Sequence, residues 1–394
     1  MSIDLLQVKG VKCSSIASGI KKNNILDLSL ISLSKGSSTA AVFTQNIFCA
    51  APVIVSKNHI NSNIEALLIN SGNANAGTGE RGLEDCYNTC VYLAEELEIK
   101  PEQVLPFSTG VIGEFLPLEA FKSNVNILVS SLSKNGMSKV ANGILTTDLV
   151  EKSYSTSINI GGKTVTLSGV AKGSGMIRPD MATMLSFIVS DISASKEELQ
   201  DCLTHAVNQS FNRITVDGDT STNDACSLSA TNQSGVQLSQ CKGEFQKALN
   251  LVSKELAQMI VKDGEGATKF VEIKIEGLES SEDCLEVAYT IAHSPLVKTA
   301  LFASDANWGR ILAAVGRTKV NGVSIENIDI YINDLQIIVS GEKSSTYTEE
   351  LGSAEMQKSE IIIRVNLGTT SLSESVWTTD LSYDYVKINA EYRS

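Results

Sequence analysis

The sequence predicts a mixed α/β protein in which strands and helices alternate, with a smaller α/β domain toward its C-terminal end. Residues 25–33, ILDLSLISL, alternate apolar and polar side chains as a half-buried strand does. Between residues 83 and 97, apolar side chains recur at the three- and four-residue spacing of one helix face. Residues 269–277, KFVEIKIEG, return to the alternation of a strand, and no internal repeat accompanies this order.

Further elements follow in chain order. Residues 121–132 carry apolar side chains at helical spacing, and residues 157–169, SINIGGKTVTLSG, predict a hairpin that turns at its two adjacent glycines. Ser195 and Glu198 have the spacing of a capping box, which predicts that a helix begins there. A long helix is predicted over residues 245–260, before the strand at residue 269.

The polar stretch LESSED, residues 278–283, is the best candidate for a domain boundary. It predicts an α/β domain of residues 1–279 and a smaller C-terminal α/β domain of residues 280–394. Within the second domain, the Ser-Pro pair at residue 294 interrupts a helix, and residues 324–341 predict two alternating strands.

Length, charge and cysteine content exclude several classes of protein. With 394 residues, the chain has room for one large or two to three ordinary domains. Its net charge of −13 argues against nucleic-acid binding, which needs clustered Lys and Arg. No apolar stretch reaches membrane-spanning length, and the first ten residues lack the order of a signal peptide. Eight scattered cysteines suit the reduced thiols of a cytoplasmic protein, and none of the three histidines lies near the close pair Cys86 and Cys90, so no metal site is expected.

Two glycine-rich motifs resemble phosphate-binding loops. Residues 77–82, GTGERG, fit the dinucleotide pattern, but six residues separate them from the preceding apolar run, where a dinucleotide fold has a tight turn. Residues 161–164, GGKT, have the end of a P-loop, but Ser157 stands where its first glycine is required. The second motif is interpreted as a hairpin turn, and the first stays a weak signal for nucleotide binding.

The stretch KGSGMIRPDMATMLSF, residues 172–187, suggests a threonine nucleophile. A serine or cysteine triad needs a histidine base, and none of the three histidines lies in a context that aims it at a nucleophile. A threonine made N-terminal by a backbone cut carries its own base, because its α-amine lies beside its hydroxyl. Thr183 follows the small Ala182 and begins an apolar strand. The plain alternative, a β-branched residue that favours a strand, is preferred on this stretch alone.

The whole chain carries a series of specific motifs in a recognisable order. They are NSGNANAGTGERG, STGVIG, TTD, KGSGMIRPDMATML, DGDTSTND, DGEGATK, SPLVKTALFASDANWGRILAAVG and YVKINAEYRS. Together they closely resemble the ornithine acetyltransferases of arginine biosynthesis, also called glutamate N-acetyltransferases, of the bifunctional ArgJ type. The resemblance runs from near one end of the chain to the other.

This resemblance implies stacked mixed sheets flanked by helices, an αββα-like arrangement of the DmpA/ArgJ kind. It also implies self-cleavage between Ala182 and Thr183 into an α chain (1–182) and a β chain (183–394), which assemble as a heterotetramer of two α and two β chains. Thr183 would take the acetyl group of N2-acetyl-L-ornithine and pass it to L-glutamate. No cofactor is implied; some members also use acetyl-CoA as an acetyl donor, which these motifs do not decide.

The resemblance also assigns roles to individual residues. Thr109 and Gly110 match the oxyanion hole, where neutral donors stabilise the charge that develops on the attacked carbonyl. The substrate-binding positions that match the family are Thr146, Lys172, Thr183, Glu265, Asn389 and Ser394. Since the substrates carry carboxylates and ornithine adds an ammonium, Lys172 is expected to pair with the α-carboxylate and Glu265 with the amine.

Some positions depart from the usual family pattern, and alternatives stay open. Arg178 and Asp180 stand where Ala and Asn are common, close enough to Thr183 to alter self-cleavage. An N-terminal-threonine amidohydrolase would share the nucleophile but pass the acyl group to water, and a non-catalytic nucleotide-binding module built on GTGERG is the more distant alternative. Residues 217–224, DGDTSTND, lack the glutamate of a calcium loop and are predicted to form a polar loop near the active site.

Overall fold

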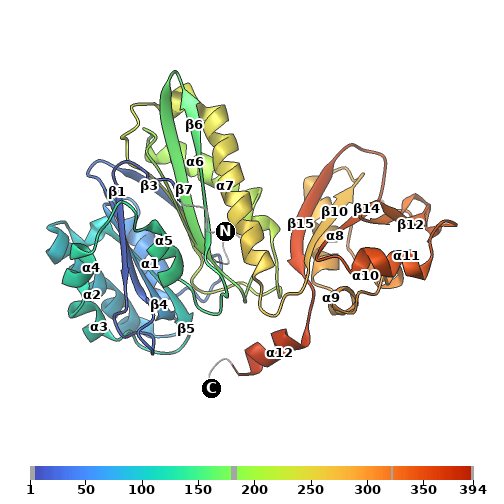
Figure 1. The fold of residues 1–394 in the computed structure, drawn as a ribbon, viewed down its shortest axis with the longest axis horizontal. Coiled ribbons are helices and arrows are strands. Elements are labelled where there is room, and N and C mark those ends of the chain that lie inside the picture. The colour runs from blue at the N-terminus through green and yellow to red at the C-terminus, as the bar shows by residue number, and fades with distance from the viewer. Residues whose placement is uncertain (1–4, 179–183, 321–322, 392–394) are drawn as a thin grey trace. The chain divides into compact units, whose positions relative to one another are not determined.

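The computed structural model describes residues 5–178, 184–320 and 323–391, and the chain forms two compact units (Figure 1). The first unit holds Met1–Asn212 with Asp219–Ile260, and the second holds Arg213–Gly218 with Val261–Ser394. The division therefore falls near residue 260 instead of residue 279. The reason is a non-local pairing: residues 270–276 form a strand in the sheet of the second unit.

The first unit contains a four-stranded sheet in the order β1-β2-β4-β5. Its strands are β1 (Val11–Ile16), β2 (Leu28–Leu33), β4 (Ala66–Asn73) and β5 (Val104–Val111). The pair β4–β5 is parallel, with Ser71 opposite Thr109 and Gly72 opposite Gly110, while β1–β2 and β2–β4 are antiparallel. The parallel register places the predicted oxyanion residues beside the end of β4.

A five-stranded sheet in the order β3-β9-β8-β7-β6 forms the second layer of this unit. Its strands are β3 (Ser38–Phe43), β6 (Lys152–Ile160), β7 (Lys163–Lys172), β8 (Leu185–Ser190) and β9 (Ala225–Ala230). Only β8–β9 is parallel, and it pairs Leu185 with Ala225. The predicted hairpin is confirmed as β6–β7, and its glycines Gly161 and Gly162 both have positive φ, as a type I′ turn requires.

The two sheets share one apolar core. Apolar side chains of β2, β4 and β5 pack with those of β7, β8 and β9, and helix α5 (Met137–Gly143) adds to the same cluster. Phe107 of β5 and Phe187 of β8 meet edge to face, with ring centroids 5.0 Å apart. This contact joins the two layers directly.

Helices cover the outer face of each sheet in this unit. Against the four-stranded sheet pack α1 (Ala51–His59), α2 (Gly79–Leu97), α3 (Leu118–Lys122) and α4 (Val125–Ser130), through a second apolar cluster. Against the five-stranded sheet lie α6 (Lys196–Asn208) and α7 (Lys242–Lys262). Figure 1 shows α7 running along β6 and β7. The four layers confirm the predicted αββα-like arrangement.

The second unit is built on a six-stranded sheet in the order β13-β12-β11-β14-β10-β15. Its elements are β10 (Phe270–Glu276), α8 (Ser281–Ala292), α9 (Pro295–Phe302), α10 (Trp308–Gly316), β11 (Asp329–Ile332), β12 (Leu335–Val339), β13 (Glu342–Lys343), α11 (Glu349–Met356), β14 (Glu360–Asn366), β15 (Ser373–Thr379) and α12 (Tyr383–Ala390). Every second residue of β10 and β14 packs into an apolar core with side chains of helices α8 to α11. The intervening residues are polar: Lys274 and Glu276, for example, form an ion pair at 2.6 Å.

Local signals predicted most of these elements. The capping box is confirmed, because Ser195 Oγ accepts from the Glu198 amide and the Glu198 carboxylate accepts from the Ser195 amide. The helix predicted over residues 121–132 is divided into α3 and α4.

No helix among the described residues is long and apolar enough to span a membrane.

Truncating the aromatic contact between the sheets tests this architecture. We expect Phe187→Ala to lower the free energy of unfolding by about 3–5 kcal/mol, because a fully buried ring is lost and a cavity remains. Urea denaturation followed by circular dichroism is the measurement, since both tryptophans, Trp308 and Trp377, lie in the second unit. The control Phe48→Ala, at a ring that is 60% exposed, should change it by about 0.5 kcal/mol or less. Equal losses in the two variants would contradict the shared core.

Candidate active site

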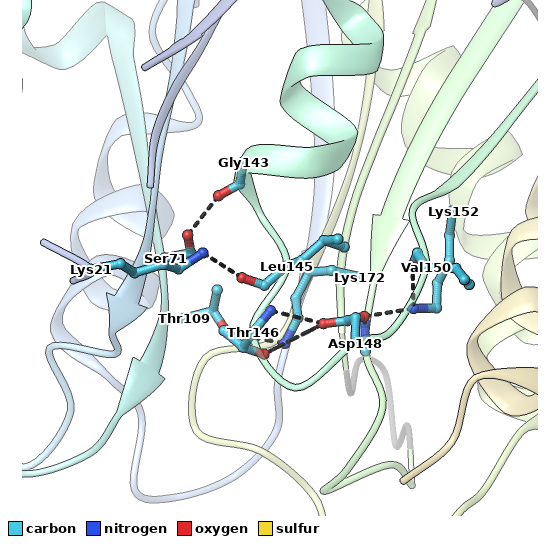
Figure 2. Close-up of polar contacts among 11 residues, drawn as sticks. Lys21, Ser71, Thr109, Gly143, Leu145, Thr146, Asp148, Val150, Lys152 and Lys172 are labelled. Carbon is cyan, nitrogen blue, oxygen red and sulfur yellow. Dashed lines mark hydrogen bonds and ion pairs between the residues drawn. The ribbon is translucent and has the colours of Figure 1, made fainter. Parts of the chain in front are cut away.

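Lys172 gathers three of the predicted site residues into one cluster. It is the last residue of β7, and only 9% of its surface is exposed. Its Nζ donates to Thr146 Oγ1 at 2.8 Å and to Thr109 Oγ1 at 3.2 Å (Figure 2). Residues from β5, from the segment after α5 and from β7 therefore meet at a single ammonium group.

A buried carboxylate, Asp148, holds this cluster together. Its Oδ1 accepts from Lys152 Nζ at 2.6 Å and from the Gly173 amide at 2.7 Å, and its Oδ2 accepts from the Thr146 amide at 2.9 Å. Lys172 Nζ lies 4.0 Å from the same Oδ2, and the side chains of Asp148 and Lys152 are both 0% exposed. Both oxygens of Asp148 are therefore engaged, as Figure 2 shows.

The charges around Asp148 decide its ionisation. Burial alone would raise the pKa of this carboxyl, but the positive charges of Lys172 and Lys152, with hydrogen bonds from Lys152 and Thr146, outweigh it. The pKa lies well below its ordinary value, so Asp148 is ionised at neutral pH.

Thr109 and Gly110, the two residues predicted for the oxyanion hole, lie near the end of β5. Because Lys172 donates to Thr109 Oγ1, the proton of the threonine hydroxyl is left to donate elsewhere. Gly110 has φ +133°, and a Cβ there would lie 2.3 Å from the backbone carbon of Gly72. A side chain cannot fit at this close approach between β4 and β5, which explains the glycine.

A pocket in the first unit joins this cluster to the start of β8. Its described lining includes Thr109, Lys172, Met184, Asn223 and Asp224. Met184 is the residue that directly follows the predicted nucleophile Thr183. Thr183 itself, Ala182 and the unusual Asp180 lie outside the described residues.

Asn223 ties the pocket to the end of β5. Its Nδ2 donates to Ser108 O at 2.9 Å and to Ala74 O at 2.6 Å. The loop predicted near the active site therefore contributes Asn223 and Asp224 to the pocket wall. Thr220 of the same loop donates to Arg178 O at 3.1 Å, so this carbonyl is anchored.

Two residues at the site carried no assigned role in the sequence. Asp148 stands in the TTD motif, two residues after Thr146, so its motif gave a signal that could have been used. Lys21 lies in none of the sequence motifs. Its Nζ donates to Leu145 O at 2.6 Å. Burial first, and then the charge of Lys172, lower the pKa of Lys21 to about 8, although Asp27 and Asp148 oppose the shift. Its placement could not be seen without the tertiary structure.

The other predicted substrate positions lie in the second unit. Asn389 of α12 donates through Nδ2 to Glu265 Oε2 at 2.8 Å, and Glu265 is only 8% exposed. Nearby, Gly266 has φ +67°, and a Cβ there would lie 2.4 Å from the Tyr385 amide. The loop and α12 are thus closely packed. Ser394 lies outside the described residues.

The GTGERG stretch, residues 77–82, lies at the start of a helix. Residues 77–82 serve the start of α2: a Cβ on Gly82 would lie 1.8 Å from Thr78 Oγ1, and Asn75 donates to Gly82 O at 2.9 Å. β4 lies between an antiparallel and a parallel neighbour, unlike the first strand of a dinucleotide fold. Over the described ranges, no three His, Cys, Asp or Glu side chains gather as metal ligands do.

Comparison with known proteins identifies the family. The family model described as the ArgJ family matches residues 12–394. The chain belongs to the ArgJ family. The arginine biosynthesis bifunctional protein ArgJ of Pseudomonas fluorescens (strain Pf0-1) is 48% identical over 392 residues, which cover 98% of this chain and 97% of that protein. The protein of the same name from Methylococcus capsulatus is 48% identical over 396 residues, covering 100% of this chain and 97% of the relative.

A solved structure of the family is also similar to this ArgJ-family chain. The arginine biosynthesis bifunctional protein ArgJ from Bacillus halodurans is 40% identical, with a TM-score of 0.51. The match covers 53% of this chain and 100% of the solved chain.

Neutralising Asp148 tests the buried cluster. We expect Asp148→Asn to lower the free energy of unfolding at pH 7 by about 3–5 kcal/mol, because the buried Lys152 ammonium loses the carboxylate charge 2.6 Å from it. Since the pKa of Asp148 is lowered on folding, its contribution is complete above its unfolded pKa of about 4 and declines as the pH falls below that value. The difference between the two proteins should therefore shrink between about pH 5 and pH 2 in urea denaturation.

The matched control is Asp201→Asn, which removes a carboxylate whose side chain is 75% exposed and 3.9 Å from Lys242. An exposed pair contributes about 1 kcal/mol or less. A loss in Asp148→Asn no larger than in this control, or one that does not change with pH, would contradict the role given to Asp148.

Proposed function

We propose that this protein transfers the acetyl group of N2-acetyl-L-ornithine to L-glutamate, through an acetyl ester on Thr183. The observation that carries the proposal is the pocket of the first unit, which brings Thr109 and Lys172 to Met184, the neighbour of Thr183 in the chain. Membership of the ArgJ family, whose relatives are named for arginine biosynthesis, supports the same reaction.

The chemistry proceeds by two acyl transfers at one hydroxyl. Thr183 Oγ attacks the acetyl carbonyl of acetylornithine, its proton passes to the α-amine of Thr183, and that proton then goes to the departing ornithine nitrogen. The Thr109 hydroxyl and the Gly110 amide are the donors assigned to the oxyanion. Glutamate then attacks the acetyl-Thr183 ester through its amine, and N-acetylglutamate leaves with Thr183 restored.

Charge complementarity assigns the remaining residues. Lys172 pairs with the α-carboxylate that both substrates carry, and Thr146, which already accepts from Lys172, lies beside it. Glu265, oriented by Asn389, takes the side-chain ammonium of ornithine. Ser394 is the remaining assigned substrate contact.

Self-cleavage between Ala182 and Thr183 gives Thr183 its α-amine and yields α chain 1–182 and β chain 183–394, which we infer assemble as two α and two β chains. The Bacillus halodurans chain matches only 53% of this chain over its full length, which is the size that such a cut produces. A cytoplasmic location is supported by the eight cysteines, which are all free. No cofactor is required, and acetyl-CoA is a second acetyl donor to be tested in the same assay.

The deciding experiment combines the intact mass with product analysis. Freshly purified untagged protein should give two denatured masses that match a cut at Ala182 and Thr183. With acetylornithine, glutamate should be converted to N-acetylglutamate in step with ornithine release. Acetate released at the same rate without glutamate would instead establish the amidohydrolase alternative, and a single full-length mass would contradict the mechanism.

A second prediction separates the two charged substrate positions. In a ping-pong reaction the two half-reactions can be measured separately, with acetylornithine and with glutamate. Lys172→Ala should lower kcat/KM for both by about 10- to 100-fold, because both substrates lose a charge-assisted contact. Glu265→Gln should affect the acetylornithine half-reaction more strongly, since glutamate has no side-chain amine.

Lys163→Ala is the matched control, because Lys163 lies at the opposite, exposed end of the same strand and donates to Gly235 O. It should retain wild-type kinetics. Wild-type kcat/KM in Lys172→Ala would rule out the carboxylate pairing, and equal effects of Glu265→Gln on both half-reactions would rule out the amine pairing.

A further inference from the structure

Asp224 is a buried carboxyl that the reaction described above does not use. It stands directly before β9, is 4% exposed, and lines the pocket together with Thr109, Lys172 and Met184. Its Oδ2 has no hydrogen-bond partner among the described residues. Since a buried polar atom without a partner is costly, such an atom in a pocket wall indicates a functional role.

The surroundings of Asp224 favour the protonated acid. Burial raises the pKa of this carboxyl well above its ordinary value, and hydrogen bonds from Ser221 and the Met184 backbone, with the charge of Lys172, only partly oppose the shift. A carboxyl with a raised pKa is a stronger base once it is ionised. It is therefore better suited to proton transfer near neutral pH than an exposed aspartate.

The sheet places Asp224 beside the predicted cleavage point. β8 and β9 are parallel, Leu185 pairs with Ala225, and the Ala225 amide donates to Met184 O at 2.9 Å. Asp224 and Met184 are thus neighbours across the two strands. Thr183 directly precedes Met184 in the chain, so Asp224 lies beside the neighbour of the predicted nucleophile.

Other titratable groups are poorly placed for proton transfer in the uncut chain, where Thr183 has no free α-amine. Lys172 and Asp224 are the titratable groups in the described lining of the pocket, and Lys172 is held by Thr109, Thr146 and the charge of Asp148. None of the three histidines belongs to that lining. The base that takes the proton of Thr183 in the uncut chain is therefore neither the α-amine nor a histidine of this lining.

We propose that Asp224 transfers the proton during self-cleavage between Ala182 and Thr183, an inference that rests on the proposed function. The carboxylate takes the proton of Thr183 Oγ as this oxygen attacks the Ala182 carbonyl carbon. The carbon–nitrogen bond then breaks, and the acid returns the proton to the leaving nitrogen, which becomes the α-amine of Thr183. Water hydrolyses the resulting ester to the Ala182 carboxylate and the free Thr183 hydroxyl.

The experiment compares the rate of self-cleavage in three full-length chains. Wild type, Asp224→Asn and Asp191→Asn are made by cell-free synthesis with a short labelling pulse, and the uncut chain is followed on denaturing gels. Asn keeps the shape of the side chain but cannot accept the proton, so we expect cleavage to slow at least about 100-fold. Asp191 is the matched control: it is also buried, burial also raises its pKa, and it lies just beyond the opposite end of β8. Asp191→Asn should cleave at the wild-type rate.

Two further measurements separate proton transfer from a structural role. The thermal midpoint of uncut Asp224→Asn should stay close to that of a wild-type chain made uncleavable by Thr183→Ala. Hydroxylamine cleaves an accumulated ester, so it should not release the two chains from Asp224→Asn; release would place the block at hydrolysis and overturn the assignment. If Asp224→Asn fails to fold, Asp224→Ser replaces it, and failure of both would make the carboxyl structural and overturn the inference.

The outcomes distinguish this inference from the proposed function. Wild type that cleaves, with Asp224→Asn cleaving at the same rate, overturns the inference alone. Wild type that stays whole overturns both, because no self-cleavage remains for Asp224 to serve.

Discussion

The buried carboxylate of Asp148 is the interaction on which the candidate site depends. It lies between two lysines in a region closed to solvent, where each ammonium group would be costly without a negative partner. Asp148 also accepts from two backbone amides, that of Gly173, which follows Lys172 in the chain, and that of Thr146, whose side chain contacts Lys172. With Lys172 charged and held, the hydroxyls of Thr109 and Thr146 take defined orientations.

Parallel strand pairs supply the second constraint. The pair β4–β5 brings Gly72 against Gly110, and the pair β8–β9 brings Met184 beside Asp224. Parallel neighbours begin at one edge of a sheet and end at the other. The ends of β4 and β5 and the starts of β8 and β9 therefore bring residues far apart in the chain to one pocket. Asn223 links the two strand pairs by donating to Ser108 O, just before Thr109.

Local signals in the sequence predicted elements well where the cause was local. The capping box at Ser195, the turn at Gly161 and the helical spacing of α2 depend on residues a few positions apart. The domain boundary depended on β10 joining β14 and β15, almost a hundred residues later, and no local pattern reports such a pairing. The boundary predicted at residue 279 therefore differs from the division near residue 260.

The sequence by itself predicted a mixed α/β protein, from periodicity and turn chemistry. Its motifs predicted the family, and through that resemblance the αββα-like arrangement and the residue types of the site. Only the tertiary structure decided which side chains meet: Lys172 with Thr109 and Thr146 in the first unit, and Glu265 with Asn389 in the second. It also decided that Asp148 is ionised and that Asp224 favours its acid form. The reason is physical, because the pKa of a carboxyl depends on its burial and on the charges within a few ångströms, which chain order does not specify.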